Sequence, residues 1–82
     1  MGATIGKIIN TFGIKGDLKI ASSTDFGEQR FAPGSHILVK TPREYLDFEI
    51  SKHYIHKGFD MIAFKGFTDI NEVEKYKGCI CY

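Results

Sequence analysis

The spacing of glycine and proline along the chain is the feature that most restricts its fold. Nine Gly and two Pro interrupt the 82 residues, and the segments between them are short. Short segments bounded by turn residues favour β-strands over long helices. We therefore expect six strands, over residues 4–10, 17–21, 36–41, 45–54, 60–65 and 79–82.

Several of these segments alternate polar and apolar residues, as strands do when one face packs in a core. The clearest case is residues 45–54, in which Leu46, Phe48 and Ile50 share one face. The pattern predicts a core that contains Ile5, Ile8, Leu18, Ile20, Leu38, Leu46, Phe48, Ile50, Ile62, Phe64, Val73 and Ile80.

One longer segment, residues 68–77, has the pattern of a helix. Asp69 can cap its N-terminus, and Glu72 three residues later completes a capping box. Gly78 then stands where a left-handed residue ends a helix. A single helical turn is also expected around residues 26–30. Together these elements predict an all-β fold, a six-stranded antiparallel β-barrel with one short helix before the last strand, because ring closure removes exposed strand edges.

Length and charge restrict the possible functions. A chain of 82 residues forms one domain, 1–82. Eleven Lys and Arg against ten Asp and Glu give a net charge of +1, so we expect any contact with nucleic acid to be local and to use a few concentrated positive charges. The N-terminus lacks the apolar segment of a signal peptide, and no apolar run approaches the ~20 residues of a membrane span. We expect a cytoplasmic protein that does not bind membranes.

Residues suited to catalysis or metal binding are scattered along the chain. His36, His53, His56, Cys79 and Cys81 are possible ligands, but their spacing does not match a zinc site. No serine lies in a nucleophile elbow, and no acid–base constellation is visible. We therefore expect no enzyme activity, no catalytic residue, no metal, no cofactor and no disulfide between the two cysteines.

Two turns combine positive charge with glycine. The first is Gly13-Ile14-Lys15-Gly16, and the second ends the segment 52–58, which holds two Lys, two His and one Tyr but no acidic residue. Lys can neutralise phosphates, and Tyr or His can stack on an unpaired base. We predict that a partner or RNA binds at Lys15, Gly16, Lys52, His56, Lys57 and Gly58. The alternative is that these residues only close hairpins and keep them soluble.

Several short motifs, taken in order, span nearly the whole chain. They are Ile5-Gly6-Lys7-Ile8, Gly13-Ile14-Lys15-Gly16, Thr24-Asp25-Phe26, Gln29-Arg30-Phe31, Pro33-Gly34-Ser35, His56-Lys57-Gly58, Phe64-Lys65-Gly66-Phe67 and the segment from Asp69 to Gly78. Each is weak alone, but the ordered set with compatible spacing resembles the N-terminal domain of the RimM family. Two positions depart from the family pattern: Phe12 stands where members often have His, and Tyr54-Ile55 stands where they often have Arg-Pro.

The resemblance implies a ribosome maturation factor, needed for late assembly of the small (30S) subunit and for processing of its 16S rRNA. It implies a six-stranded barrel similar to the second domain of translation GTPases, followed after residue 82 by a PRC-barrel domain. The implied partners are small-subunit ribosomal protein nineteen and 16S rRNA in the head of the immature subunit. We expect the protein to be a monomer and to have no small-molecule substrate. Two other functions remain open: a general RNA-binding or translation-factor barrel, and a protein-interaction barrel within another complex.

Overall fold

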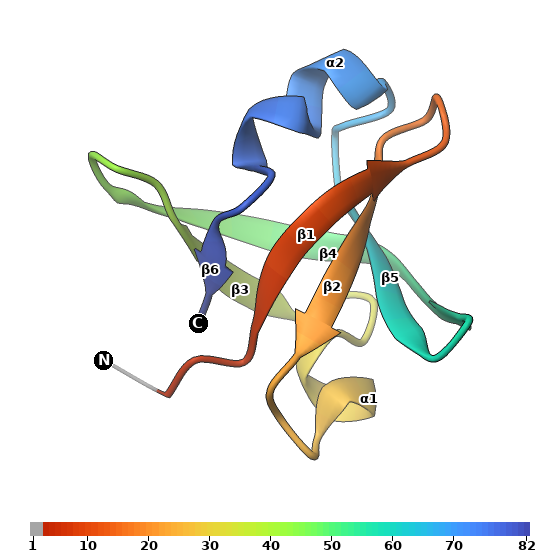
Figure 1. Ribbon diagram of the computed structural model, residues 1–82, viewed down its shortest axis with the longest axis vertical. Coiled ribbons are helices and arrows are strands. Elements are labelled where there is room, and N and C mark those ends of the chain that lie inside the picture. The colour runs from red at the N-terminus through yellow and green to blue at the C-terminus, as the bar shows by residue number, and fades with distance from the viewer. Residues whose placement is uncertain (1–2) are drawn as a thin grey trace.

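Six antiparallel strands pair edge to edge until the ring closes. The computed structural model describes residues 3–82, and within them the strands follow the ring order β1-β2-β5-β4-β3-β6 (Figure 1). The strands are β1 (Gly6–Phe12), β2 (Asp17–Ser22), β3 (His36–Lys40), β4 (Tyr45–His56), β5 (Phe59–Phe64) and β6 (Ile80–Cys81). The all-β prediction with six antiparallel strands is confirmed, while the likeness to translation GTPases stays a prediction.

Short helical elements lie at the two ends of the ring. Helix α1 (Gly27–Arg30) lies at one end, and α2 (Ile70–Val73) with the 3₁₀ turn η1 (Glu74–Tyr76) lies at the other (Figure 1). The single turn predicted around residues 26–30 is confirmed. No helix formed by residues 3–82 is both long enough and apolar enough to cross a membrane.

The helix expected over residues 68–77 is one α turn followed by a 3₁₀ turn. Its predicted start is confirmed: Asp69 Oδ1 accepts a hydrogen bond from the Asn71 amide over 2.8 Å, and Glu72 Oε1 accepts one from the Asp69 amide. Val73 and Tyr76 are both buried, three residues apart. Both side chains belong to the apolar cluster in the interior of the ring, so this segment covers one end of it.

The interior of the ring holds one apolar cluster. Of the twelve residues predicted for it, eight are buried: Ile5, Ile8, Leu18, Ile20, Ile50, Ile62, Phe64 and Val73. Leu46 and Phe48 are half-buried and pack against the cluster. Phe48 stacks on Phe64 with the ring centroids 4.4 Å apart and the planes 9° from parallel. The cluster also includes Phe31, which the alternation did not indicate.

The face of two strands was predicted wrongly. In β3 the buried residues are Ile37 and Val39, whereas Leu38 is only half-buried. In β6 Cys81 is fully buried, and Ile80 lies half-exposed. The run Ile37-Leu38-Val39 is apolar at every position, so its pattern cannot show which face turns inward.

Candidate functional site

The ends of the two long hairpins lie against each other. Phe12 ends β1, just before the turn Gly13–Gly16, and His56 ends β4, just before the turn Lys57-Gly58. Their rings are in contact, with centroids 4.9 Å apart. The structure thus joins the two turns that the sequence analysis selected separately. It does so through Phe12, the last residue of β1.

The turn between β4 and β5 is a two-residue hairpin loop in which both residues have positive φ. Lys57 has φ of 52° and Gly58 has φ of 83°, and His56 pairs with Phe59 on either side. Positive φ at both central residues is the geometry of a type I′ turn, which Asn-Gly favours. Within residues 3–82, Lys57 is the one residue other than glycine with positive φ. Lys57 thus adopts a backbone conformation that is unfavourable for lysine, in the turn that closes the hairpin.

A carboxylate lies between the two hairpins. Asp17, the first residue of β2, is only 8% exposed. Its Oδ2 accepts a 2.6 Å hydrogen bond from the Tyr54 hydroxyl, and its Oδ1 lies 3.0 Å from Lys52 Nζ. The hydrogen bond to Asp17, with some desolvation, raises the pKa of Tyr54 to about 12. Asp17 thereby holds Lys52 and Tyr54 of β4 close to the start of β2.

The outer face between these residues is apolar. Residues paired across a sheet share a face. Met61 of β5 pairs with Lys19 on one side and with Tyr54 on the other, so the three lie together on the outside of the ring. Met61 is nevertheless fully buried, because neighbouring side chains cover it. Beside it, Lys19 Nζ lies 4.1 Å from the centre of the Phe59 ring.

We call this region the hairpin surface. It consists of Phe12, Lys15, Asp17, Lys19, Lys52, Tyr54, His56, Lys57, Gly58 and Phe59. It combines lysines with aromatic rings, and such a combination can bind the phosphates and the bases of RNA together.

The two remaining predicted residues occupy different environments. Lys15 is exposed and, with Asp17 and Lys52, lines a hollow of about 310 Å³. Gly16 is buried: a side chain there would come within 3.0 Å of the Asp69 carbonyl oxygen. The Ile70 amide also donates to the Ile14 carbonyl oxygen over 3.0 Å. The close approach that Gly16 permits is therefore made by α2 of the same chain, and Gly16 supports the turn from within.

Five residues of this surface were not among the predicted binding residues: Phe12, Asp17, Lys19, Tyr54 and Phe59. One signal was available, because Met61-Ile62-Ala63-Phe64 is apolar at every position. Such a run indicates a strand that is covered on both faces. The outer cover comes from Tyr54 and its neighbours on other strands, and local alternation gives no information about them.

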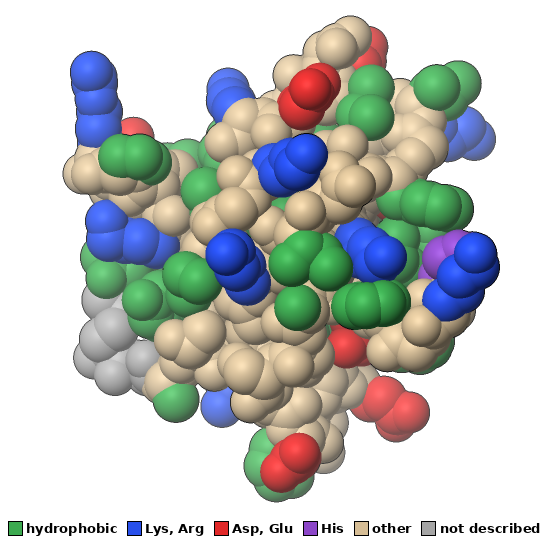
Figure 2. Space-filling model, in the orientation of Figure 1, with side chains coloured by type: hydrophobic (Ala, Val, Ile, Leu, Met, Phe, Trp, Pro, Cys, Tyr) green, Lys and Arg blue, Asp and Glu red, His purple; other side chains and the backbone are tan. Residues whose placement is uncertain are grey.

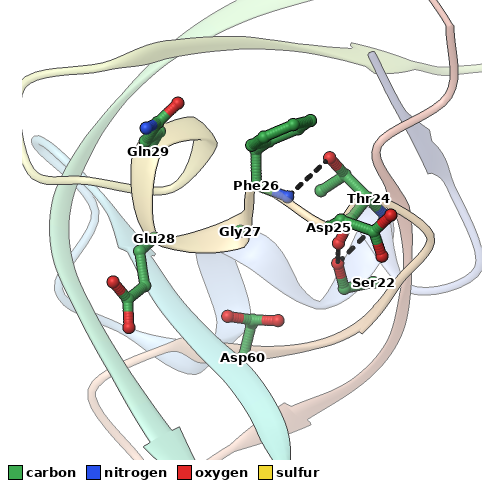
Figure 3. Close-up of a pocket in the computed structure, with 8 residues that line it drawn as sticks. All are labelled: Ser22, Thr24, Asp25, Phe26, Gly27, Glu28, Gln29 and Asp60. Atoms are coloured by element: carbon green, nitrogen blue, oxygen red, sulfur yellow. Dashed lines mark hydrogen bonds between the residues drawn. The ribbon is translucent and has the colours of Figure 1, made fainter.

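Another hollow, lined mostly by polar residues, lies away from the hairpin surface, beside α1. It holds about 410 Å³ and is lined by Ser22, Thr24, Asp25, Phe26, Gly27, Glu28, Gln29 and Asp60 (Figure 3). Asp60 Oδ1 lies 2.7 Å from His53 Nε2, so that carboxylate already has a partner. Asp25, Glu28 and Asp60 give the hollow an acidic lining, which does not suit RNA phosphates.

The possible metal ligands are dispersed. His53 contacts Asp60, His56 contacts Phe12, and His36 Nδ1 lies 2.7 Å from Asp47 Oδ1. Both thiols are free, and burial raises the pKa of the Cys81 thiol to about 12. Among residues 3–82, no three His, Cys, Asp or Glu side chains come together as a metal site.

Comparisons with known proteins agree with the resemblance found in the sequence. The sequence model of the RimM N-terminal domain matches residues 3–82. Ribosome maturation factor RimM of Oceanobacillus iheyensis is 50% identical over 74 residues, which cover 90% of this chain and 43% of that protein. The Staphylococcus epidermidis protein of the same name is 44% identical over all 82 residues, or 49% of its length.

A solved structure has the same fold. The 16S ribosomal RNA processing protein RimM of Pseudomonas aeruginosa superimposes with a TM-score of 0.82 at 26% identity, over 98% of this chain and 49% of that one. The chain therefore spans about half the length of the curated relatives and of the solved structure that it matches.

Proposed function

The chain belongs to the RimM family, and on that premise we propose that it acts as a ribosome assembly factor that binds the head of the immature small subunit and supports 16S rRNA maturation. Its partners there are 16S rRNA and small-subunit ribosomal protein nineteen, which it meets as a monomer in the cytoplasm. The relatives' name, ribosome maturation factor, supports the general role. We further propose that a PRC-barrel domain follows residue 82.

The contact between Phe12 and His56 is the observation that best supports a binding surface at the hairpin ends. It makes one continuous surface from two hairpin ends, each with an exposed lysine, Lys15 or Lys57. Phe12 is 43% exposed, so its ring is available to a base or to an apolar side chain. Contacts to phosphate position a protein on RNA, and aromatic rings add stacking.

The role that we propose is binding without catalysis. The hairpin surface lacks a nucleophile paired with a base, and its one carboxylate is already engaged by Tyr54 and Lys52. A general RNA-binding barrel would use the same surface, but it would not distinguish an immature subunit from other RNAs. A protein-interaction barrel of another complex would not bind ribosomal particles at all.

Co-sedimentation with immature small subunits over a salt series tests the proposal. Lys57→Ala removes one phosphate contact, so the slope of log affinity against log salt should fall by about one unit. Its free energy of unfolding should change by no more than about 0.5 kcal/mol, because the residue is exposed. Lys65→Ala serves as the control, since Lys65 is exposed outside the hairpin surface.

Two outcomes would contradict the proposal. If Lys57→Ala co-sediments like the unmodified protein at every salt concentration, the hairpin surface is not the docking site. If the protein binds tRNA or mature subunits as tightly as immature ones, the general RNA-binding function replaces the assembly role.

A further inference from the structure

A second group of basic residues gathers around β6, on a different part of the ring. Lys7 of β1 and Lys40 of β3 both pair with Ile80, so the two lysines flank β6 from opposite sides on the outer face. Neighbouring strands lie ~4.8 Å apart, which puts the two backbones roughly 10 Å from each other. The last strand thus brings together two lysines that are separated by 33 positions in the sequence.

Two shallow hollows add three more basic residues; Ile80 of β6 lines one of them, and the other shares Thr41, Pro42 and Lys75 with it. Lys40, Lys75 and Lys77 line one hollow of about 420 Å³, and Arg43 and Lys75 line another of about 520 Å³. We call Lys7, Lys40, Arg43, Lys75 and Lys77 the β6 patch. Figure 2 shows this side of the molecule, on which Lys and Arg side chains spread over β1, β6 and η1.

The charges of the β6 patch are not cancelled by ion pairs. Within residues 3–82, none of its five side chains has a carboxylate within 4.0 Å, whereas Lys52 and Lys65 each have one. Glu44, in the turn before β4, is the one acidic residue that lines the two hollows. Five of the eleven basic residues therefore form a patch with net positive charge on a chain whose total charge is only +1. The fold separates charges that are mixed along the sequence.

Aromatic rings border the same patch. Lys40 Nζ lies 5.3 Å from the centre of the Tyr45 ring, and Tyr45 meets Tyr82 edge to face at 5.6 Å. Tyr45 is 40% exposed. Base stacking on such a ring tolerates any sequence, because every base has a π-face.

We propose that the β6 patch binds the phosphate backbone of a single-stranded RNA segment, with Tyr45 as a stacking platform. This proposal does not depend on the hairpin surface. Four of the five basic residues are lysines, which bind phosphate as point charges. Lysine is depleted at the cores of protein–protein interfaces, whereas nucleic-acid interfaces are strongly positive. RNA therefore fits the patch better than an acidic protein does.

Fluorescence anisotropy with labelled oligouridylate, measured over a salt series, tests the proposal on the 82-residue chain. Each contact to single-stranded phosphate contributes ~0.7 to the salt slope, so the double variant Lys75→Gln/Lys77→Gln should lower it by about 1.4. If the double variant and the unmodified protein bind equally at 1 M salt, this difference in slope makes the variant bind roughly 25-fold more weakly at 0.1 M salt. Lys7 lies in β1, away from Lys75 and Lys77 in the sequence, and Lys7→Gln should lower the slope by about half as much as the double variant does.

Lys65→Gln is the matched control, because Lys65 is exposed away from the patch. Thermal unfolding of every variant separates lost binding from lost folding. An unchanged slope in both the double variant and Lys7→Gln would overturn the proposal, as would an equal loss in Lys65→Gln. Competition by polyglutamate as strong as that by RNA would show instead that the patch accepts an acidic protein.

The readout also separates this proposal from the proposed function. Oligouridylate binding requires no ribosomal particle. In one outcome, Lys57→Ala alone weakens binding to immature subunits while the β6 variants bind oligouridylate normally. In that case the RNA-binding role of the β6 patch is wrong, and the docking role of the hairpin surface is supported.

Discussion

The Tyr54 hydroxyl donates a 2.6 Å hydrogen bond to Asp17 Oδ2 and so connects β4 with β2 across the strand between them. Asp17 is nearly buried, and its other oxygen contacts Lys52. The hydrogen bond therefore adds a side-chain contact between two hairpins that are already joined by the pairing of β2 with β5.

Tyr54→Phe should lower the free energy of unfolding by about 1–3 kcal/mol, because it leaves a buried carboxylate with one hydrogen-bonding partner fewer. Urea unfolding measures the change. Tyr45→Phe is the matched control, since the Tyr45 hydroxyl makes no hydrogen bond to the described part of the chain and its removal should change stability little. Equal effects of the two substitutions would show that the bond to Asp17 does not stabilise the fold.

Lys57→Asn should raise the free energy of unfolding by up to about 1 kcal/mol, because asparagine adopts the left-handed conformation of residue 57 more readily than lysine does. Lys57→Gln, which has no such preference, should leave stability unchanged. Both substitutions remove the charge, so both should weaken binding to immature subunits. A variant that is stabilised and still binds fully would argue that Lys57 has no role in docking.

The two cysteines should differ in reactivity. Burial raises the pKa of the Cys81 thiol to about 12, whereas Cys79 is partly exposed. Because the thiolate is the reactive form, a thiol reagent at pH 8 should modify Cys79 in the folded protein and Cys81 only after unfolding. Mass spectrometry of peptides from native and denatured protein measures both sites. Equal labelling of both cysteines in the folded protein would contradict the burial of β6.

The pKa of His36 should lie above its usual value of 6.5, chiefly because its ring is hydrogen-bonded to Asp47. A raised pKa in the folded state adds stability that is complete below pH 6.5 and disappears as the pH rises through the raised value. An NMR titration of the ring measures it. Asp47→Asn should lower the pKa of His36, and no change in that variant would exclude the contact in solution.

The sequence by itself determined the strand segments, the turns between them and the start of the helix. Glycine and proline placed the turns, because only certain residues adopt the required backbone angles, and the Asp69–Glu72 capping box is a local interaction. The alternation in residues 45–50 also predicted correctly which face of β4 turns toward the core. The coincidence of glycine with lysine in the sequence also selected both turns of the hairpin surface, with Lys15 and Lys57.

The tertiary structure alone decided which distant residues meet. Strand β6 has two residues, too few for alternation to show its inner face, and its pairing with β1 and β3 makes Cys81 the buried one. The same ring closure places Lys7 and Lys40 on either side of β6, and the fold puts Phe12 of β1 in contact with His56 of β4. These contacts depend on pairing between segments far apart in the chain, and a local pattern of polar and apolar residues carries no information about such pairing.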